Sequence, residues 1–174
     1  MAPTASFIRP SLTDRFSGLH RLIGNTPLIA VDFLYRGEPR VLYAKQESLN
    51  LTGSIKDRMA LFIVEEAYRS GALVPGARIA EATSGNTGIS FAAVGRALGH
   101  PVTIFMPDWM SAERMSIIAS FGAEIVLTVF MRVAGEFKEQ AARTERHARA
   151  GKQKARPLGR AFFFCLAVIG SRPV

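Results

Sequence analysis

Short apolar runs alternate along the first part of the chain with segments in which apolar residues have helical spacing. Residues 41–45 form a short, mostly apolar run that is typical of a buried strand. A helix is expected to begin near Ile55, with Ser54 as its N-cap and Gly71 in the left-handed position just past its end. Its apolar positions recur at three- and four-residue spacing: Met59, Phe62, Ile63 and Ala67. The pattern therefore predicts one strand followed by one helix.

The same order of elements recurs further along the chain. Apolar and β-branched runs predict strands at three places: residues 78–82, 102–106 and 123–127. A small-residue helix is expected at 89–98 with Gly99 closing it, and another helix is expected after the cap residue Ser111. Each predicted helix therefore lies between two predicted strands.

Strands that alternate with helices in this way lie parallel and are joined by right-handed crossovers, with helices on the faces of the sheet. We therefore predict an α/β fold, a parallel sheet with flanking helices in three layers (α/β/α). Residues 1–20 show no clear period and are expected to form a partly ordered lead-in. The predicted α/β region then extends from residue 21 to residue 128.

Charge separates this region from the rest of the chain. The net charge is +8, but residues 1–128 hold 12 Lys and Arg against 11 Asp and Glu, whereas residues 129–174 hold 10 against 3. Residues 129–174 are therefore a divergent basic tail. A basic tail can bind nucleic acid, yet this one has few aromatic residues among its cations to stack on bases, so we expect no nucleic-acid partner.

Cysteine and histidine usage limits the classes of site further. The single cysteine, Cys165, rules out an internal disulfide, and His20, His100 and His147 are too far apart to suggest a metal site. The longest apolar run, residues 161–170, is about half the length of a bilayer span, so membrane insertion is not expected. We expect a cytoplasmic protein without a metal.

Lys56 is the first candidate for chemistry. It lies in the first turn of a predicted helix, where the positive end of the helix dipole and the cationic neighbour Arg58 are expected to lower the pKa of its amine. A neutral amine is what attacks an aldehyde to form a Schiff base. A solvated surface lysine is the alternative that the residues alone leave open.

The turn at residues 83–88 is the second candidate. It combines hydroxyls, an amide and glycines at a predicted helix start, which suits an anion such as a carboxylate or a phosphate. An ordinary capped turn is the alternative. Neither the Walker spacing nor the dinucleotide-binding glycine spacing is found at a strand-to-helix loop, which argues against ATPase and NAD-dependent functions.

Taken together and in order, five motifs resemble the cysteine synthase and cystathionine β-synthase family of fold-type II pyridoxal-phosphate enzymes. They lie at residues 23–28 (IGNTPL), 50–58 (NLTGSIKDR), 81–88 (EATSGNTG), 106–114 (MP with SAER) and 121–124 (FGAE). The resemblance covers about residues 20–128, and it implies the N-terminal half of this fold.

The resemblance also implies roles for particular residues. Lys56 would hold pyridoxal 5'-phosphate as an internal aldimine and act as the base that removes the substrate α-proton, while Asn86 would hydrogen-bond the ring hydroxyl. The carboxylate of the amino-acid substrate would be held by a group in the turn: Thr83, Ser84, Gly85 and Thr87. The family reaction is β-elimination from an activated serine to an aminoacrylate, to which a nucleophile such as sulfide adds. Family members are usually homodimers.

The resemblance ends after Thr128. Family members are roughly twice as long, and their second half supplies a glycine- and threonine-rich loop for the cofactor phosphate, which has no counterpart after Thr128. We therefore expect an incomplete fold, a truncated chain that is inactive alone, and a tail that is disordered or produced by a frameshift. A non-catalytic amino-acid-binding or regulatory fragment is the alternative. The sequence does not distinguish cysteine synthase from cystathionine β-synthase, diaminopropionate synthase or a related enzyme.

Overall fold

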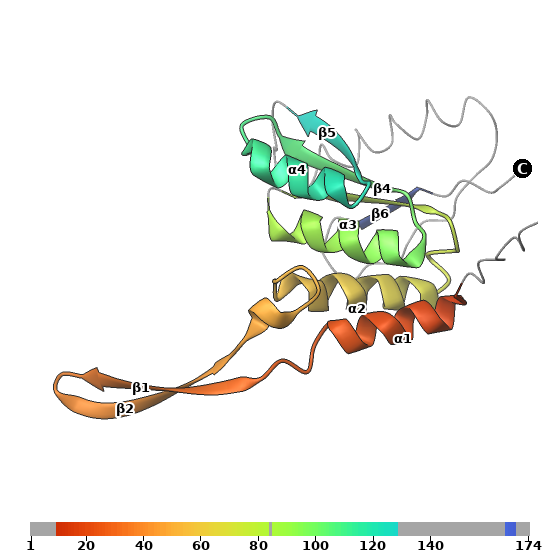
Figure 1. The fold of residues 1–174 in the computed structure, drawn as a ribbon. Helices are drawn as coiled ribbons and strands as arrows, with labels where there is room; N and C mark the ends of the chain where they lie inside the picture. The colour runs from red at the N-terminus through yellow and green to blue at the C-terminus, as the bar shows by residue number, and fades with distance from the viewer. Residues whose placement is uncertain (1–9, 84, 129–165, 170–174) are drawn as a thin grey trace, which may run out of the picture.

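The computed structural model describes residues 10–83, 85–128 and 166–169, and divides into an α/β body and a hairpin that projects from it (Figure 1). The helices are α1 (Leu12–Leu22), α2 (Lys56–Arg69), α3 (Asn86–Leu98) and α4 (Ala112–Ser120), with a 3-10 turn η1 (Glu47–Leu49). The strands are β1 (Leu28–Tyr35), β2 (Glu38–Lys45), β3 (Arg78–Ala82), β4 (Val102–Pro107), β5 (Glu124–Thr128) and β6 (Leu166–Ile169). No helix in these ranges is long and apolar enough to cross a membrane.

The body is built on a four-stranded sheet of order β5-β4-β3-β6. β3, β4 and β5 run parallel, in registers that include Glu81 opposite Ile104 and Ile104 opposite Ile125. The predicted α/β class and parallel sheet are therefore confirmed. β6 was not expected, and it pairs with β3 in the antiparallel direction.

Two glycines allow α3 to lie very close to the sheet. A Cβ added to Gly88 would be 2.6 Å from Cγ2 of Thr83, and one added to Gly95 would be 2.4 Å from Cγ2 of Val102. The same Cβ at Gly88 would be 3.4 Å from Cδ1 of Ile118 in α4, so α3 and α4 pack together on one face. α2 and α1 lie beyond α3 (Figure 1). Within the described ranges, α1 to α4 thus lie on the α3 side of the sheet.

The lead-in expected at residues 1–20 is wrong for its described part, because residues 12–22 form α1. A capping box begins this helix: Ser11 Oγ accepts a hydrogen bond from the Asp14 backbone N–H, and the Asp14 carboxylate accepts one from the Ser11 N–H. Leu19 is buried in the common core, and Phe16 packs edge-on against Tyr68 of α2. α1 is therefore an integral layer of the body.

Most predicted helix boundaries agree with the structure within a residue or two. α2 begins at Lys56 with Ile55 as its N-cap, one residue after the expected cap Ser54, whose Oγ accepts a hydrogen bond from the Lys56 N–H at 3.1 Å. Gly71 and Gly99 both have left-handed backbones after their helices, with φ of +71° and +87°. The exception is α3, which begins at Asn86, three residues earlier than expected.

The hairpin consists of β1 and β2, joined by Arg36 and Gly37, whose φ values of +53° and +82° suit a two-residue turn. It extends away from the body (Figure 1), and all eight residues of β1 are exposed. The strand expected at residues 41–45 exists, but the prediction that it is buried is wrong, because β2 is exposed at seven of its eight positions. β1 was not predicted.

Candidate functional site

The first turns of α2 and α3 lie side by side at one end of the parallel sheet. α3 begins just after the carboxyl end of β3, and α2 begins at Lys56. Their contact is direct, since Ser90 Oγ in α3 donates a hydrogen bond of 2.5 Å to Asp57 Oδ1 in α2. The two sequence-predicted segments, Lys56 and the turn at 83–88, are therefore brought to neighbouring helix N-termini, the usual location of ligand sites in parallel sheets (Figure 1).

Lys56 has an exposed side chain at the first position of α2. Its backbone is held by the Ser54 hydroxyl, and Asp57 beside it is fully buried. Within the described part of the chain its amine has no hydrogen-bond or ion-pair partner. The amine is thus carried by a well-anchored turn while it remains accessible to an aldehyde.

The turn at 83–88 is shorter than expected, because Asn86, Thr87 and Gly88 belong to the first turn of α3. Thr83 is buried, and its Oγ1 accepts a hydrogen bond from the Gly85 N–H at 3.3 Å. Gly85 is the N-cap and carries no side chain that could satisfy the first N–H groups of the helix. N–H groups at a helix start, together with the helix dipole, are suited to hold an anion. Ser84, the remaining predicted substrate residue, lies outside the described residues.

Arg58 does not act as the expected cationic neighbour of Lys56. Its guanidinium donates to both carboxylate oxygens of Glu47, at 2.7 Å and 3.0 Å, and to Thr26 Oγ1 at 2.9 Å. Glu47 also accepts hydrogen bonds from the Thr26 hydroxyl and from the Asn50 amide. The hydrogen bonds from Arg58, Thr26 and Asn50 lower the pKa of Glu47 to about 2. The positive charge of Arg58 is therefore compensated by a carboxylate.

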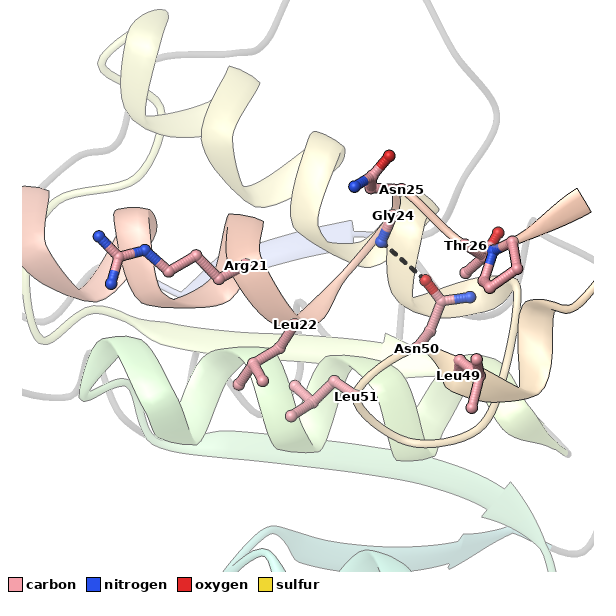
Figure 2. Close-up of a pocket in the computed structure, with 9 residues that line it drawn as sticks. Arg21, Leu22, Gly24, Asn25, Thr26, Leu49, Asn50 and Leu51 are labelled. Atoms are coloured by element: carbon pink, nitrogen blue, oxygen red, sulfur yellow. Dashed lines mark hydrogen bonds between the residues drawn. The ribbon is translucent and has the colours of Figure 1, made fainter.

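This network joins the first two motifs of the sequence. A cavity of about 380 Å³ lies beside it, and in Figure 2 Asn50 reaches across to Gly24, whose N–H donates to Asn50 Oδ1 at 2.8 Å. The cavity is lined by residues 21–27 and 49–51, excluding Ile23. Neither this cavity nor a second one along the hairpin includes Lys56 or the turn at 83–88. Lys56 and Asn86 are exposed, whereas Thr83 is buried.

The residues present fit part of a pyridoxal-phosphate site. An exposed amine on an anchored helix start suits the cofactor aldehyde, and the N–H groups that Gly85 leaves uncapped suit a substrate carboxylate. Asp57, Ser90 and Glu47 were not singled out from the sequence. The signal in the sequence that could have pointed to two of them is position: Asp57 lies within the motif at residues 50–58, and Glu47 lies just before it. No group of three or more His, Cys, Asp or Glu side chains able to hold a metal occurs in the described ranges.

The curated relatives of this chain include cysteine synthases. The probable cysteine synthase of Bacillus subtilis is 44% identical over 107 residues, which are 62% of this chain and 34% of that protein. The cysteine synthase of Staphylococcus aureus strain N315 is 43% identical over 108 residues, 62% of this chain and 35% of that protein. The chain thus spans about a third of the length of the curated relatives it matches.

Solved structures give the same result. A hydrogen sulfide-producing enzyme from Fusobacterium nucleatum is 49% identical with a TM-score of 0.70, covering 75% of this chain and 41% of that one. O-ureido-L-serine synthase is 35% identical with a TM-score of 0.64, again covering 75% and 41%. The resemblance to cysteine synthases and the α/β fold of their N-terminal part are therefore confirmed.

The family match extends further than the five motifs. The profile of the family described as "Pyridoxal-phosphate dependent enzyme" matches residues 19–164, beyond the point where the motifs end at about residue 128. This match covers most of the chain and includes Lys56 and the turn at 83–88. The chain belongs to the pyridoxal-phosphate dependent enzyme family.

Proposed function

We propose that this chain carries the N-terminal part of a pyridoxal-phosphate enzyme that replaces the β-substituent of an activated serine with sulfide or another small nucleophile. The observation that supports this most directly is the contact of α2 and α3 through Asp57 and Ser90, which brings the lysine and the anion-binding turn together. The relatives include cysteine synthases, a hydrogen sulfide-producing enzyme and O-ureido-L-serine synthase. Their names share a chemistry at the β-carbon of a serine or cysteine.

In this proposal each residue has a defined role. The cofactor, when bound, supplies a ring that stabilises negative charge at the substrate α-carbon. Lys56 Nζ would hold the cofactor until the substrate amine takes its place, and the freed lysine amine would then accept the proton from that carbon. Asn86 donates a hydrogen bond to the ring hydroxyl. The substrate carboxylate is held by hydroxyl and N–H groups of the turn: Thr83, Ser84, Gly85 and Thr87. Lys56 and Asn86 are the first residues of α2 and α3, two helices that are in contact, which supports their acting on one ligand.

We further propose that the 174-residue chain binds the cofactor weakly and is inactive alone. The hairpin exposes large apolar side chains of both strands, including Leu34 at 73% and Tyr43 at 68%. Burial of apolar surface contributes about 25 cal/mol per Å² to stability. An exposed surface of this kind indicates that the hairpin requires a further packing partner before a rigid, closed site can form.

Reductive trapping tests the proposed role of Lys56. The chain is incubated with excess pyridoxal phosphate and reduced with borohydride, and the adduct is located by mass spectrometry. We expect the adduct on Lys56 and little on Lys45, whose Nζ donates to the Thr26 carbonyl. Lys56→Ala should remove the dominant adduct. Equal labelling of all lysines, or unchanged labelling in the variant, would contradict the proposal.

A second candidate function is amino-acid binding without catalysis. The specific observation in its favour is the α3 N-terminus, where Gly85 leaves the first N–H groups uncapped for a carboxylate. Calorimetry with serine and O-acetylserine in the absence of cofactor separates the two. Binding that persists in Lys56→Ala, with no adduct in the wild-type chain, would favour this second function.

A further inference from the structure

One buried carboxylate connects the segments of the proposed site. Asp57 is fully buried. Its Oδ2 accepts a hydrogen bond from the Thr52 N–H at 2.7 Å, and its Oδ1 accepts from the Thr52 and Ser90 hydroxyls, each at 2.5 Å. A buried carboxylate is tolerated where hydrogen bonds satisfy both oxygens, and the positive end of the α2 dipole adds to this compensation. Asp57 thus joins three segments, namely the loop before α2, the start of α2 and the second turn of α3.

The two ends of the Asp57–Ser90 hydrogen bond each lie next to a residue of the proposed site. Asp57 follows Lys56 directly, and because successive residues of a helix are about 100° apart, an inward Asp57 directs Lys56 away from the core. Ser90 lies four residues after Asn86, so the two share one face of α3. The hydrogen bond therefore constrains both the rotation of α2 that aims the lysine and the face of α3 that carries Asn86.

We propose that Asp57, through Ser90, is a positioning residue that sets the direction of the Lys56 amine relative to the first turn of α3. This inference rests on the proposed function, because it assigns the contact a role in holding a ligand between Lys56 and Asn86. Asp57 itself lies beneath the surface and touches no ligand.

A purely structural role makes a different prediction. α2 and α3 also share an apolar core that includes Ala60, Val64 and Phe91, so the helices remain packed when one hydroxyl is removed. A structural Asp57–Ser90 contact would then affect stability alone. A positioning contact would affect the geometry of Lys56 beyond any change in stability.

The experiment compares three serine variants of the full chain. Ser90→Ala removes the link, and Ser90→Thr keeps a hydroxyl. Ser70→Ala is the matched control, since it removes a hydroxyl that donates to the Ala67 carbonyl at the opposite end of α2. Two quantities are measured: the rate of adduct formation on Lys56 relative to Lys45 with pyridoxal phosphate and borohydride, and amide hydrogen exchange at residues 54–57 and 85–88 without cofactor.

If Asp57 is a positioning residue, Ser90→Ala should lower the rate of adduct formation on Lys56, relative to Lys45, about tenfold. Small displacements of a reacting group have large effects on rate. Exchange should rise in both segments together, Ser90→Thr should restore most of the rate, and Ser70→Ala should change neither quantity. If Ser90→Ala and Ser70→Ala are labelled on Lys56 at the same rate, the inference is wrong, whatever the hydrogen exchange shows.

If the wild-type chain forms no adduct on Lys56, the proposed function fails. Exchange then decides the inference: a joint rise supports the link, and unchanged exchange refutes it.

Discussion

β2 and β4 are both strands rich in apolar residues, yet they differ completely in environment. β4 is buried at all six positions, whereas β2 is exposed at seven of eight. β4 lies between β3 and β5 under α3, while among the described strands β2 pairs with β1 alone. The comparison shows that apolar, β-branched sequence is enough to form a strand, but that burial depends on which segments are present to cover it.

The largest expected difference between the two regions is in the effect of truncating an apolar side chain. Ile104 in β4 is fully buried, and Ile104→Ala should reduce the free energy of unfolding by about 3 kcal/mol through lost burial and the cavity left behind. Urea unfolding followed by circular dichroism measures this change. A loss below about 1 kcal/mol would mean that the core around β4 is loosely packed.

A smaller effect is expected from the charge state of a carboxyl in the body. Glu81 in β3 is buried, one of its oxygens has no hydrogen-bond partner among the described residues, and burial raises its pKa to about 8 from an ordinary value of 4.5. Because the folded protein favours the neutral form, the contribution of Glu81 to stability is fully present below pH 4.5 and is lost as pH rises toward about 8. We expect a loss on the order of 2 kcal/mol over this interval, less than the full shift implies because the chain relaxes around the ionised group.

Glu81→Gln provides the control for this pH dependence. An amide of similar size does not ionise, so its unfolding free energy should vary much less between pH 4.5 and pH 8. Equal pH dependence in the two proteins would show that other groups are responsible.

The third prediction concerns the hairpin as a local unit. Gly37 has φ of +82°, and a β-branched residue in this conformation is strained by about 1–2 kcal/mol, so Gly37→Val should disrupt the pairing of β1 with β2. The body should keep its unfolding midpoint, since the hairpin extends away from it (Figure 1). Hydrogen exchange of residues 28–45 measures the opening of the hairpin, and that of β3 and β4 measures the opening of the body. A shift of the body midpoint would show that the hairpin and the body unfold together.

The smallest effect is expected for an exposed apolar residue of the hairpin. Val41 is 51% exposed, and Val41→Ala should change the free energy of unfolding by less than about 0.5 kcal/mol. It is the direct counterpart of Ile104→Ala in the same urea experiment. A loss as large as the one at Ile104 would mean that the hairpin is covered in solution.

Much of the body could be predicted from local signals. β3 was predicted with its observed bounds, and Gly71 and Gly99 end their helices as expected, because glycine alone adopts a left-handed backbone without strain. α1 was missed although its signals are present in the sequence, namely the Ser11–Asp14 capping box and apolar residues at helical spacing. The exposure of β2 could not be predicted, because burial depends on which other segments pack on a strand and not on the strand's own sequence.

The candidate site was predicted only as far as topology allows. The turn at 83–88 follows the parallel strand β3, as expected, but Lys56 follows β2 of the antiparallel hairpin, so its place beside the turn comes from the packing of α2 on α3. The contacts that hold the site, Asp57 with Ser90 and Glu47 with Arg58, join side chains from different segments. Such pairings leave no periodic pattern along the chain, so they become visible only in three dimensions.

The antiparallel pairing of β6 with β3 has a consequence for how the sheet assembles. Ile79 pairs with Val168, about ninety residues later, whereas β3 and β4 are joined by a single helix. Closure of so long a loop is slow, and during synthesis β3, β4 and β5 leave the ribosome well before β6 does. One edge of β3 is therefore open for part of the life of the nascent chain, and in that interval it can accept a strand from another polypeptide.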